Sequence, residues 1–205
     1  MERRLGDCTF VLGLDCCRDL STRSALYDVK WKYVFQKKSG EVCTRPTSKG
    51  ASSILDWLGD YKQPGRHWDI ISFNFGHWDS QQTKAVYQAN LEIIVRELRK
   101  TSATLIWVTT CPVPNGCETA FDLAADGRAP GRKSGVMKKY INPWANEVIK
   151  KYPEISICDQ WQFCKEHEQD SFKQWWSGSN VHFNQTTSQQ LGEFLASHAL
   201  RIWDK

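Results

Sequence analysis

Short apolar runs alternate along the chain with longer segments of helical periodicity. Residues 9–14, 68–75 and 104–109 are nearly all apolar and rich in β-formers, which is typical of strands buried in a sheet. Residues 155–158 form a shorter run of the same kind, and residues 29–36 begin with the alternation of a half-buried or edge strand. The pattern therefore predicts about five strands.

Helices are expected between these strands. A short helix is predicted over residues 51–58 and the longest one over residues 80–100. Further helices are expected over residues 136–148 and from the loop at 177–187 to the C-terminus. The side chains expected on the core face are Val86, Asn90, Leu91, Ile94, Val95 and Leu98 in the longest helix, and Leu191, Phe194, Leu195 and Ile202 in the last one. This alternation predicts a parallel sheet with helices on both faces.

Composition narrows the class of protein. A chain of 205 residues supports one well-cored domain, and no linker divides it, so a single domain is expected over residues 1–205. The net charge of +4 is spread out and indicates no nucleic-acid partner. No apolar run approaches the ~18 residues of a membrane span, and residues 1–5 do not begin a signal peptide. We therefore expect no membrane partner, and a protein that is either intracellular or has lost its leader.

The eight cysteines include no CxxC pair, and this spacing argues against a closed zinc site. Two alternatives stay open for these residues. They are compatible with extracellular disulfides, and equally with small, buried, reduced side chains.

Polar and reactive residues follow several of the predicted strands. Asp15 and Cys16 come after the first strand, residues 76–79 follow the strand at 68–75, and Cys111 follows the strand at 104–109. In parallel sheets, ligands bind beyond the carboxyl ends of the strands. His182 lies on a loop of small residues immediately before the last helix, from which it could approach the same edge as a base.

Three segments carry a family resemblance. Residues 68–79, 105–114 and 180–183, in this order and spacing, resemble the SGNH/GDSL hydrolase superfamily, and most of all a bacterial branch with a Phe-Asn-Phe-Gly-x-x-Asp motif. Residues 46–50 give a weaker match. The resemblance covers nearly the whole chain. It implies a flavodoxin-like three-layer α/β/α sandwich, hydrolysis of esters that are often acyl groups on sugars, and no metal or organic cofactor.

The resemblance assigns a nucleophile and a base. The nucleophile block falls on residues 14–16, where Asp15 matches and Cys16 replaces the family's serine. A second alignment, on Cys8, also gives a cysteine but lacks a preceding strand, so we prefer Cys16. In the last block His182 matches, whereas Ser179 replaces the aspartate that orients the histidine.

The resemblance also assigns groups that would bind the oxyanion and the substrate. Gly76 and Asp79 match the oxyanion block, in which Trp78 replaces an asparagine. Further candidates for these contacts are Asn74, His77 and Gly50. Trp175 and Trp176 precede His182 and could stack on a sugar, or anchor their loop. Asn184 begins a glycosylation sequon, but its place before the last helix indicates a helix cap first.

The substitutions leave two functions open. A thiol with a pKa of ~8.5 is partly ionised near neutrality, so a Cys16–His182 pair tolerates the loss of the carboxylate at Ser179 better than a serine would. This favours hydrolysis or transfer of an acyl group on a small-molecule or carbohydrate ester. The alternative is a catalytically degenerate ligand-binding or interaction module, because losing one oxyanion donor costs roughly 2.7–4 kcal/mol and three blocks are altered. The sequence leaves the oligomeric state open.

Overall fold

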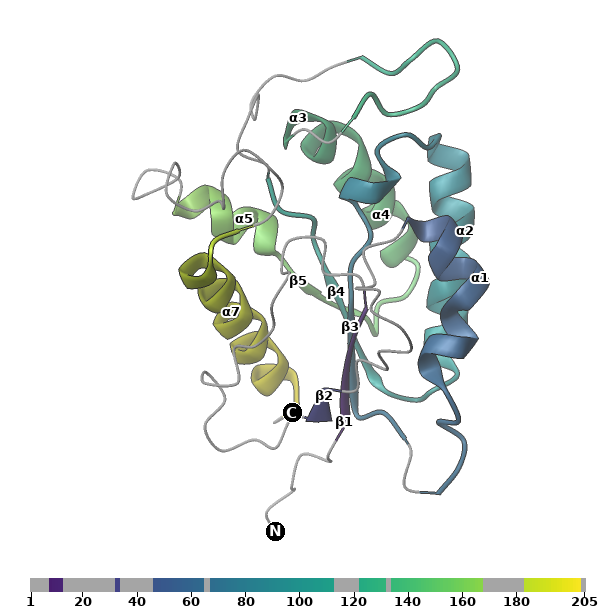
Figure 1. Cartoon of the computed structure of the whole chain (residues 1–205), viewed down its shortest axis with the longest axis vertical. Helices are drawn as coiled ribbons and strands as arrows, with labels where there is room; N and C mark the ends of the chain where they lie inside the picture. Colours follow the sequence, from purple (N-terminus) through teal and green to yellow (C-terminus); the bar gives the residue numbers. More distant parts are fainter. Residues whose placement is uncertain are drawn as a thin grey trace.

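A computed structural model of the chain describes residues 8–12, 32–33, 46–64, 67–112, 122–131, 134–167 and 183–203 (Figure 1). Within these residues five strands form one sheet in the order β2-β1-β3-β4-β5, and every neighbouring pair is parallel. The strands are β1 Cys8–Leu12, β2 Lys32–Tyr33, β3 Ile70–Phe73, β4 Thr104–Val108 and β5 Ser156–Cys158. This strand order is flavodoxin-like, as expected.

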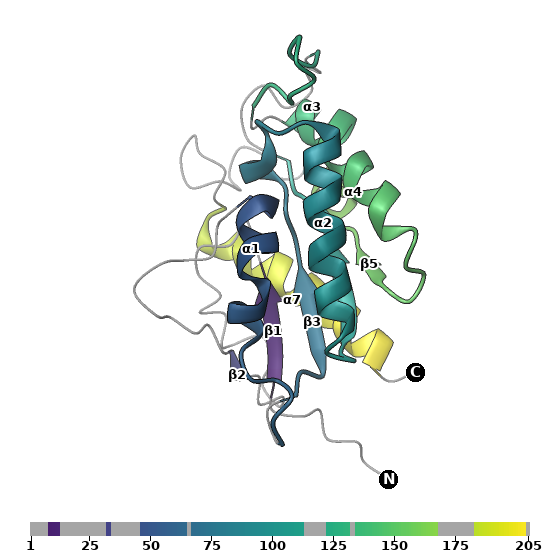
Figure 2. The ribbon, with the colours of Figure 1, turned by 90° about the vertical axis from the view of Figure 1, so that its right-hand side faces the viewer.

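Helices cover both faces of the sheet. The helices are α1 Thr47–Leu58, α2 Lys84–Arg99, α3 Ser134–Val136, α4 Asn142–Ile149, α5 Gln160–Glu166 and α7 Gln185–Trp203, with a 3-10 turn at His77–Asp79 and a π-helical turn at Met137–Ile141. Helices α1, α2 and α4 lie on one side of the sheet and α5 and α7 on the other (Figures 1 and 2). The predicted three-layer α/β/α sandwich is confirmed.

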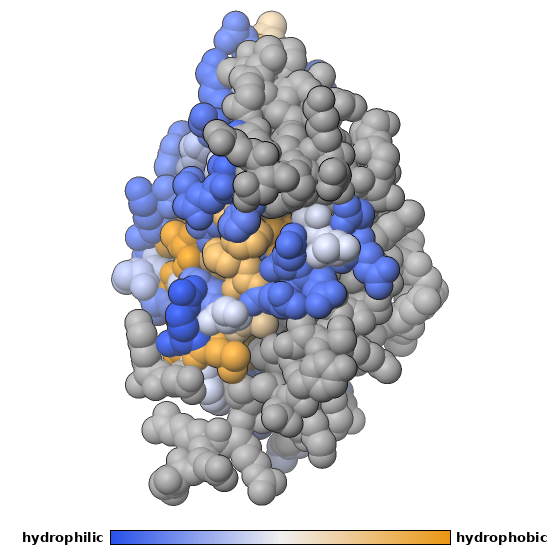
Figure 3. All heavy atoms as spheres, turned by 90° about the vertical axis from the view of Figure 1, so that its left-hand side faces the viewer, coloured by the Kyte–Doolittle hydropathy of each residue, from blue (hydrophilic) through white to orange (hydrophobic). Residues whose placement is uncertain are grey.

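Alternate residues of β3 pack into different layers, which explains its nearly continuous apolar sequence. Ile71 and Phe73 are buried with α1, α2 and α4, whereas Ile70 is buried with Leu195 and Ala199 of α7. All four residues of the strand are therefore shielded from water. On the face that carries α5 and α7, hydrophobic residues lie among hydrophilic ones in the part of the surface that is coloured in Figure 3.

The longest helix differs from the prediction in its start and its buried face. Helix α2 begins at Lys84, after Thr83 caps it by accepting a hydrogen bond from the Val86 backbone N–H. Val86 was expected in the core, but it is 49% exposed, and Tyr87 is buried instead. Tyr87 lies one helical turn before Leu91 and so continues the buried stripe, which Val86 does not.

Other helices and side chains can also be compared with the predictions from the sequence. Helix α1 begins four residues earlier than expected, and α5 was not predicted. Asn184 caps α7 as predicted, because its Oδ1 accepts a hydrogen bond of 2.9 Å from the Thr187 N–H. Trp107 and Trp144 are buried, whereas Trp57 is half-buried. Among the described helices, none is both long and apolar enough to cross a membrane.

Gly50 allows α1 to pack closely against α2 and against Phe75, which follows β3. A Cβ at this position would lie 2.7 Å from both Ile94 Cδ1 and Phe75 Cζ. Gly50→Ala is therefore expected to lower the free energy of unfolding by about 1–2 kcal/mol in urea titrations, even though alanine favours the helix by about 1 kcal/mol. Ser52→Ala, at an exposed position of the same helix, is the control. A Gly50→Ala variant as stable as the wild type would contradict this close packing.

Candidate active site

The candidate site lies at the carboxyl edge of the sheet, between β1 and β3. The strand order reverses there, and such switch points are where parallel α/β sheets bind ligands. Leu12, the last residue of β1, pairs with Phe73, the last residue of β3. Cys16 follows Leu12 by four positions in the sequence. Cys8 begins β1 at the opposite edge of the sheet, about 13 Å from Leu12 along the strand. Of the two candidate nucleophiles, this position favours Cys16.

Six of the predicted site residues lie outside the described residues. They are Asp15, Cys16, Trp175, Trp176, Ser179 and His182. Their roles remain predictions from the sequence. Gly50, Asn74, Gly76, His77, Trp78 and Asp79 are described, and five of these six lie in or beside the turn that follows β3.

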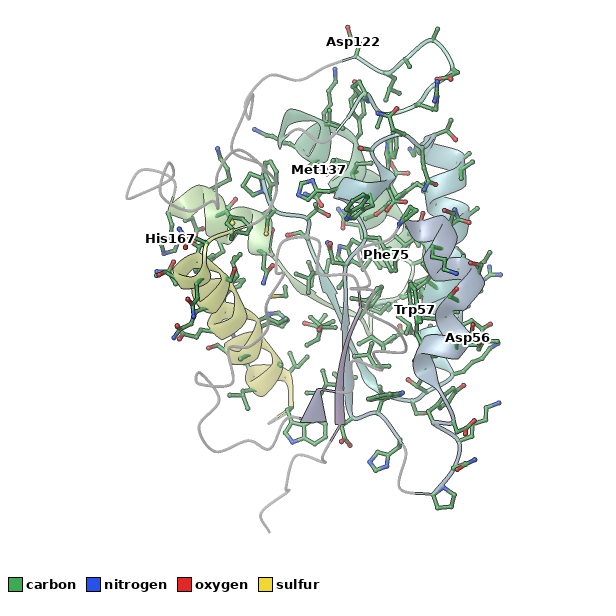
Figure 4. The ribbon with its side chains drawn as sticks, viewed as in Figure 1. Asp56, Trp57, Phe75, Asp122, Met137 and His167 are labelled. Carbon is green, nitrogen blue, oxygen red and sulfur yellow. The ribbon has the colours of Figure 1, made fainter. Side chains whose placement is uncertain are left out.

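Residues 76–79, which we call the Gly76 turn, form a tight structure at the exit of β3. The Asp79 N–H donates a hydrogen bond of 2.9 Å to the Gly76 carbonyl, which closes the turn. The turn is preceded by Phe75, which is labelled in Figure 4. The Phe75 carbonyl accepts a hydrogen bond of 2.8 Å from the Tyr87 hydroxyl of α2. A Cβ at residue 76 would lie 1.9 Å from Thr110 Oγ1, so only glycine fits between β3 and the loop after β4.

Asn74 ties the carboxyl ends of β3 and β4 together. Its Nδ2 donates to the Val108 carbonyl at 2.7 Å and to Thr110 Oγ1 at 3.0 Å. These two bonds use both hydrogens of the amide, and the side chain is buried. The amide therefore holds the edge of the sheet together, which leaves it no hydrogen for an oxyanion in this arrangement.

Asp79 is a buried carboxyl group that caps α1. Its Oδ1 accepts hydrogen bonds from the Thr47 N–H at 2.8 Å, the Thr47 hydroxyl at 2.6 Å and Gln82 Nε2 at 2.8 Å. Pro46, at the N-cap, provides no side-chain cap. The Asp79 carboxyl group caps the helix instead, although it lies 32 positions after Thr47 in the sequence. Burial raises the pKa of Asp79 to about 7, against the opposing effect of the Thr47 hydrogen bonds. Among the described residues, nothing donates a hydrogen bond to its buried Oδ2.

The other described candidates occupy different surroundings. His77 is fully buried, and Trp78 is half-buried. The Gly50 N–H donates to the Pro46 carbonyl at 3.1 Å, so it closes the first turn of α1. Gly50 therefore serves packing, and its N–H is already bonded. The histidines, cysteines and carboxylates of the described residues form no cluster of three that could hold a metal ion.

Three described cysteines are buried thiols, namely Cys111, Cys158 and Cys164. Burial raises the pKa of Cys158 to about 12, with the Asp159 carboxylate adding to the effect. This thiol is therefore unreactive near neutral pH. For these three residues, the structure matches the expectation of small, reduced core side chains.

Sequence reasoning missed several residues that shape the edge of the sheet. These are Thr47, Gln82, Tyr87, Thr110 and Asn142. Thr47 follows Pro46 at a helix start, a signal that could have been noticed. Gln82 bonds Asp79, three positions away, and Tyr87 bonds Phe75, twelve positions away. Thr110 and Asn142 meet across 32 positions, a contact that no local pattern shows.

Comparisons with known proteins reveal likeness in structure alone. Neither the protein-family models nor the curated proteins include a match to the sequence. A lipase/acylhydrolase from Enterococcus faecalis has a TM-score of 0.64 and 15% identity, with 93% of this chain and 94% of that one covered. The C-terminal catalytic domain of peptidoglycan O-acetyltransferase A from Streptococcus pneumoniae has a TM-score of 0.58 and 19% identity, covering 98% and 96%.

An acetyl xylan esterase has a TM-score of 0.65 at 8% identity, with 93% of this chain and 98% of that one covered. All three likenesses span nearly the whole of both chains. At these identities they show the fold and nothing about activity. The chain thus has the three-layer α/β/α fold of the SGNH/GDSL hydrolases.

Proposed function

We propose that the chain is a hydrolase of the SGNH/GDSL type that acts on ester-linked acyl groups through a Cys16–His182 pair. The observation that supports this most is the position of the Gly76 turn, which is fixed at the β1/β3 switch point beside the strand that leads to Cys16. The sequence of the turn carries the family resemblance. The similar structures are described as a lipase/acylhydrolase, an O-acetyltransferase and an acetyl xylan esterase, which favours acyl chemistry on a carbohydrate.

In this mechanism the Cys16 thiolate attacks the carbonyl carbon of the ester. Backbone N–H groups of the Gly76 turn and near Cys16 bind the oxyanion that forms, with Trp78 as a further donor. The alkoxide leaves with a proton from His182, and a thioester to Cys16 remains. Water, deprotonated by His182, then releases the acid and the thiol. Asp15 braces the nucleophile loop, and Ser179 accepts a hydrogen bond from His182 in place of a carboxylate.

The thiol of Cys16 can be tested directly. Labelling with iodoacetamide across pH, followed by peptide mapping, should show Cys16 alkylated faster than a free thiol of pKa ~8.5, because a neighbouring imidazolium or helix N-terminus stabilises the thiolate. Buried Cys158 is the internal reference that should not react in the folded protein. Cys16→Ala should abolish hydrolysis of p-nitrophenyl acetate, whereas Cys16→Ser should retain a small part of this activity. Slow alkylation together with equal behaviour of the two variants would reject the proposed nucleophile.

A catalytically degenerate binding protein is the second candidate. It is favoured by the amide of Asn74 and the N–H of Gly50, two candidate oxyanion donors that already hold other bonds. On this alternative, the wild type and Cys16→Ala hydrolyse p-nitrophenyl acetate equally slowly. An acetylated oligosaccharide would still bind in calorimetry, and its complex would not turn over.

A further inference from the structure

The Asn142 side chain of α4 holds the loop after β4 by two hydrogen bonds. Asn142 Oδ1 accepts a hydrogen bond of 2.9 Å from the Thr110 N–H, and its Nδ2 donates one of 3.0 Å to the Thr110 carbonyl. The two bonds form a closed pair, in which the amide takes the place of a neighbouring strand two residues beyond the end of β4. The backbone of Thr110 is therefore fixed in both position and direction.

Thr110 in turn contacts the Gly76 turn. Its side chain is 1% exposed, and its Oγ1 also accepts the hydrogen bond from Asn74. The room left at residue 76 is so small that a Cβ there would lie 1.9 Å from Oγ1 and 2.5 Å from Cγ2 of Thr110. Any shift of the Thr110 backbone must therefore move the turn or open a gap beneath it.

The local sequence explains how Asn142 reaches this point. The residues before it form a π-helical turn, Met137–Ile141, and the Asn142 N–H donates to the Met137 carbonyl, five positions back. Pro143 follows at the start of α4 and has no N–H, and in a regular α-helix its ring would collide with the Lys139 carbonyl. The wider turn leaves room for the proline ring, and the Asn142 side chain bonds Thr110 at the edge of the sheet. Such π-turns are frequent at functional sites.

We propose that Asn142 is a positioning residue of the site, which acts through the Thr110 backbone to hold the Gly76 turn in place for an oxyanion. This role rests on the proposed function, in which the turn supplies oxyanion-binding N–H groups. Asn142 itself touches no reacting atom. A displacement of about 1 Å at such a turn can lower a rate by about a hundredfold, so a residue at this distance can control the reaction.

Two measurements on Asn142→Ala test this role. The first is hydrogen exchange of the backbone amides of residues 74–80, which should become several times faster than in the wild type. The second is hydrolysis of p-nitrophenyl acetate, where kcat should fall about ten- to a hundredfold while KM stays within about threefold. Asn146→Ala is the matched control, because Asn146 is equally half-buried one turn further along α4, and it should leave both measurements unchanged.

Asn142→Asp provides a second variant in case the alanine variant does not fold. It keeps an oxygen for the Thr110 N–H but loses the donor to the Thr110 carbonyl, so an intermediate effect is expected. If Asn142→Ala lowers the melting temperature yet matches Asn146→Ala in exchange and kcat, Asn142 has no positioning role. If the wild type hydrolyses no ester, the proposed function fails, and faster exchange of residues 74–80 still supports the positioning by Asn142 while unchanged exchange rejects it.

Discussion

Replacing Asp79 by alanine is expected to lower the free energy of unfolding by about 4 kcal/mol. The variant leaves the Thr47 N–H, the Thr47 hydroxyl and the Gln82 amide without their acceptor, and two of these donors are buried. It also removes the cap of α1, which Pro46 does not replace. Urea titrations at pH 6 measure the loss, with Asp56→Ala as the control, because Asp56 is an exposed aspartate of the same helix.

The pH dependence of stability gives a sharper test of the same carboxyl group. Burial raises the pKa of Asp79 to about 7 in the folded protein, above the ordinary value of 3.8 that applies in the unfolded chain. The folded state therefore keeps a proton that the unfolded state loses, and the stability from this protonated group is full below about pH 4. This stability is lost as the pH rises to about 7, which lowers the free energy of unfolding by on the order of 4 kcal/mol. Above about pH 7 this group causes no further change.

Asp79→Asn isolates this contribution, because the amide keeps an oxygen for the Thr47 donors and has no proton to lose. Between pH 4 and pH 7 the free energy of unfolding of the wild type should fall relative to that of Asp79→Asn. The difference should then stay level up to pH 8.5. Parallel stability curves for the two proteins over this range would show that Asp79 is already ionised at pH 4.

Gly76→Ala should lose about 3 kcal/mol of stability and about a hundredfold in ester hydrolysis. The new methyl group would lie 1.9 Å from Thr110 Oγ1, and that hydroxyl cannot turn away without breaking its bond from Asn74. Urea titration and the rate with p-nitrophenyl acetate measure the two losses.

A second substitution tests the cause of the Gly76→Ala effect. Thr110→Ala removes the two atoms nearest to the new methyl group and leaves the third, the Thr110 Cβ at 2.7 Å. The double variant should therefore recover part of the stability lost by Gly76→Ala, so the two effects should not add. Simple additivity would mean that Thr110 is not the obstacle.

Much of the fold could be predicted because the central strands β3 and β4 are buried on both faces. The apolar run around β3 identifies a central strand without any knowledge of its neighbours, and the alternation with helices gives the parallel order. Helix α5 was not predicted because its seven residues are too few to show a helical period. Its start is marked in the sequence only by Asp159, which caps it. The π-helical turn before Asn142 has no periodic signature either, so its position appears only in three dimensions.

The candidate site could be located from the sequence but not understood from it. The motif at residues 73–79 marks Gly76 and Asp79 through a family resemblance, yet nothing local shows that Asp79 bonds Thr47, 32 positions earlier. Asn74 illustrates the same difficulty. Its sequence position suggests an oxyanion donor, whereas its partners Val108 and Thr110 lie 34 and 36 positions away and use both of its hydrogens.

These long separations also determine when the site forms during folding. The bonds Thr47–Asp79, Asn74–Thr110 and Thr110–Asn142 each close a loop of more than 30 residues, and each requires a strand of the sheet to be in place first. We therefore expect the edge of the sheet to be assembled late, after the folding barrier. Substitutions there will mainly speed unfolding and leave the folding rate nearly unchanged, so the lifetime of the native state depends on the same contacts that shape the site.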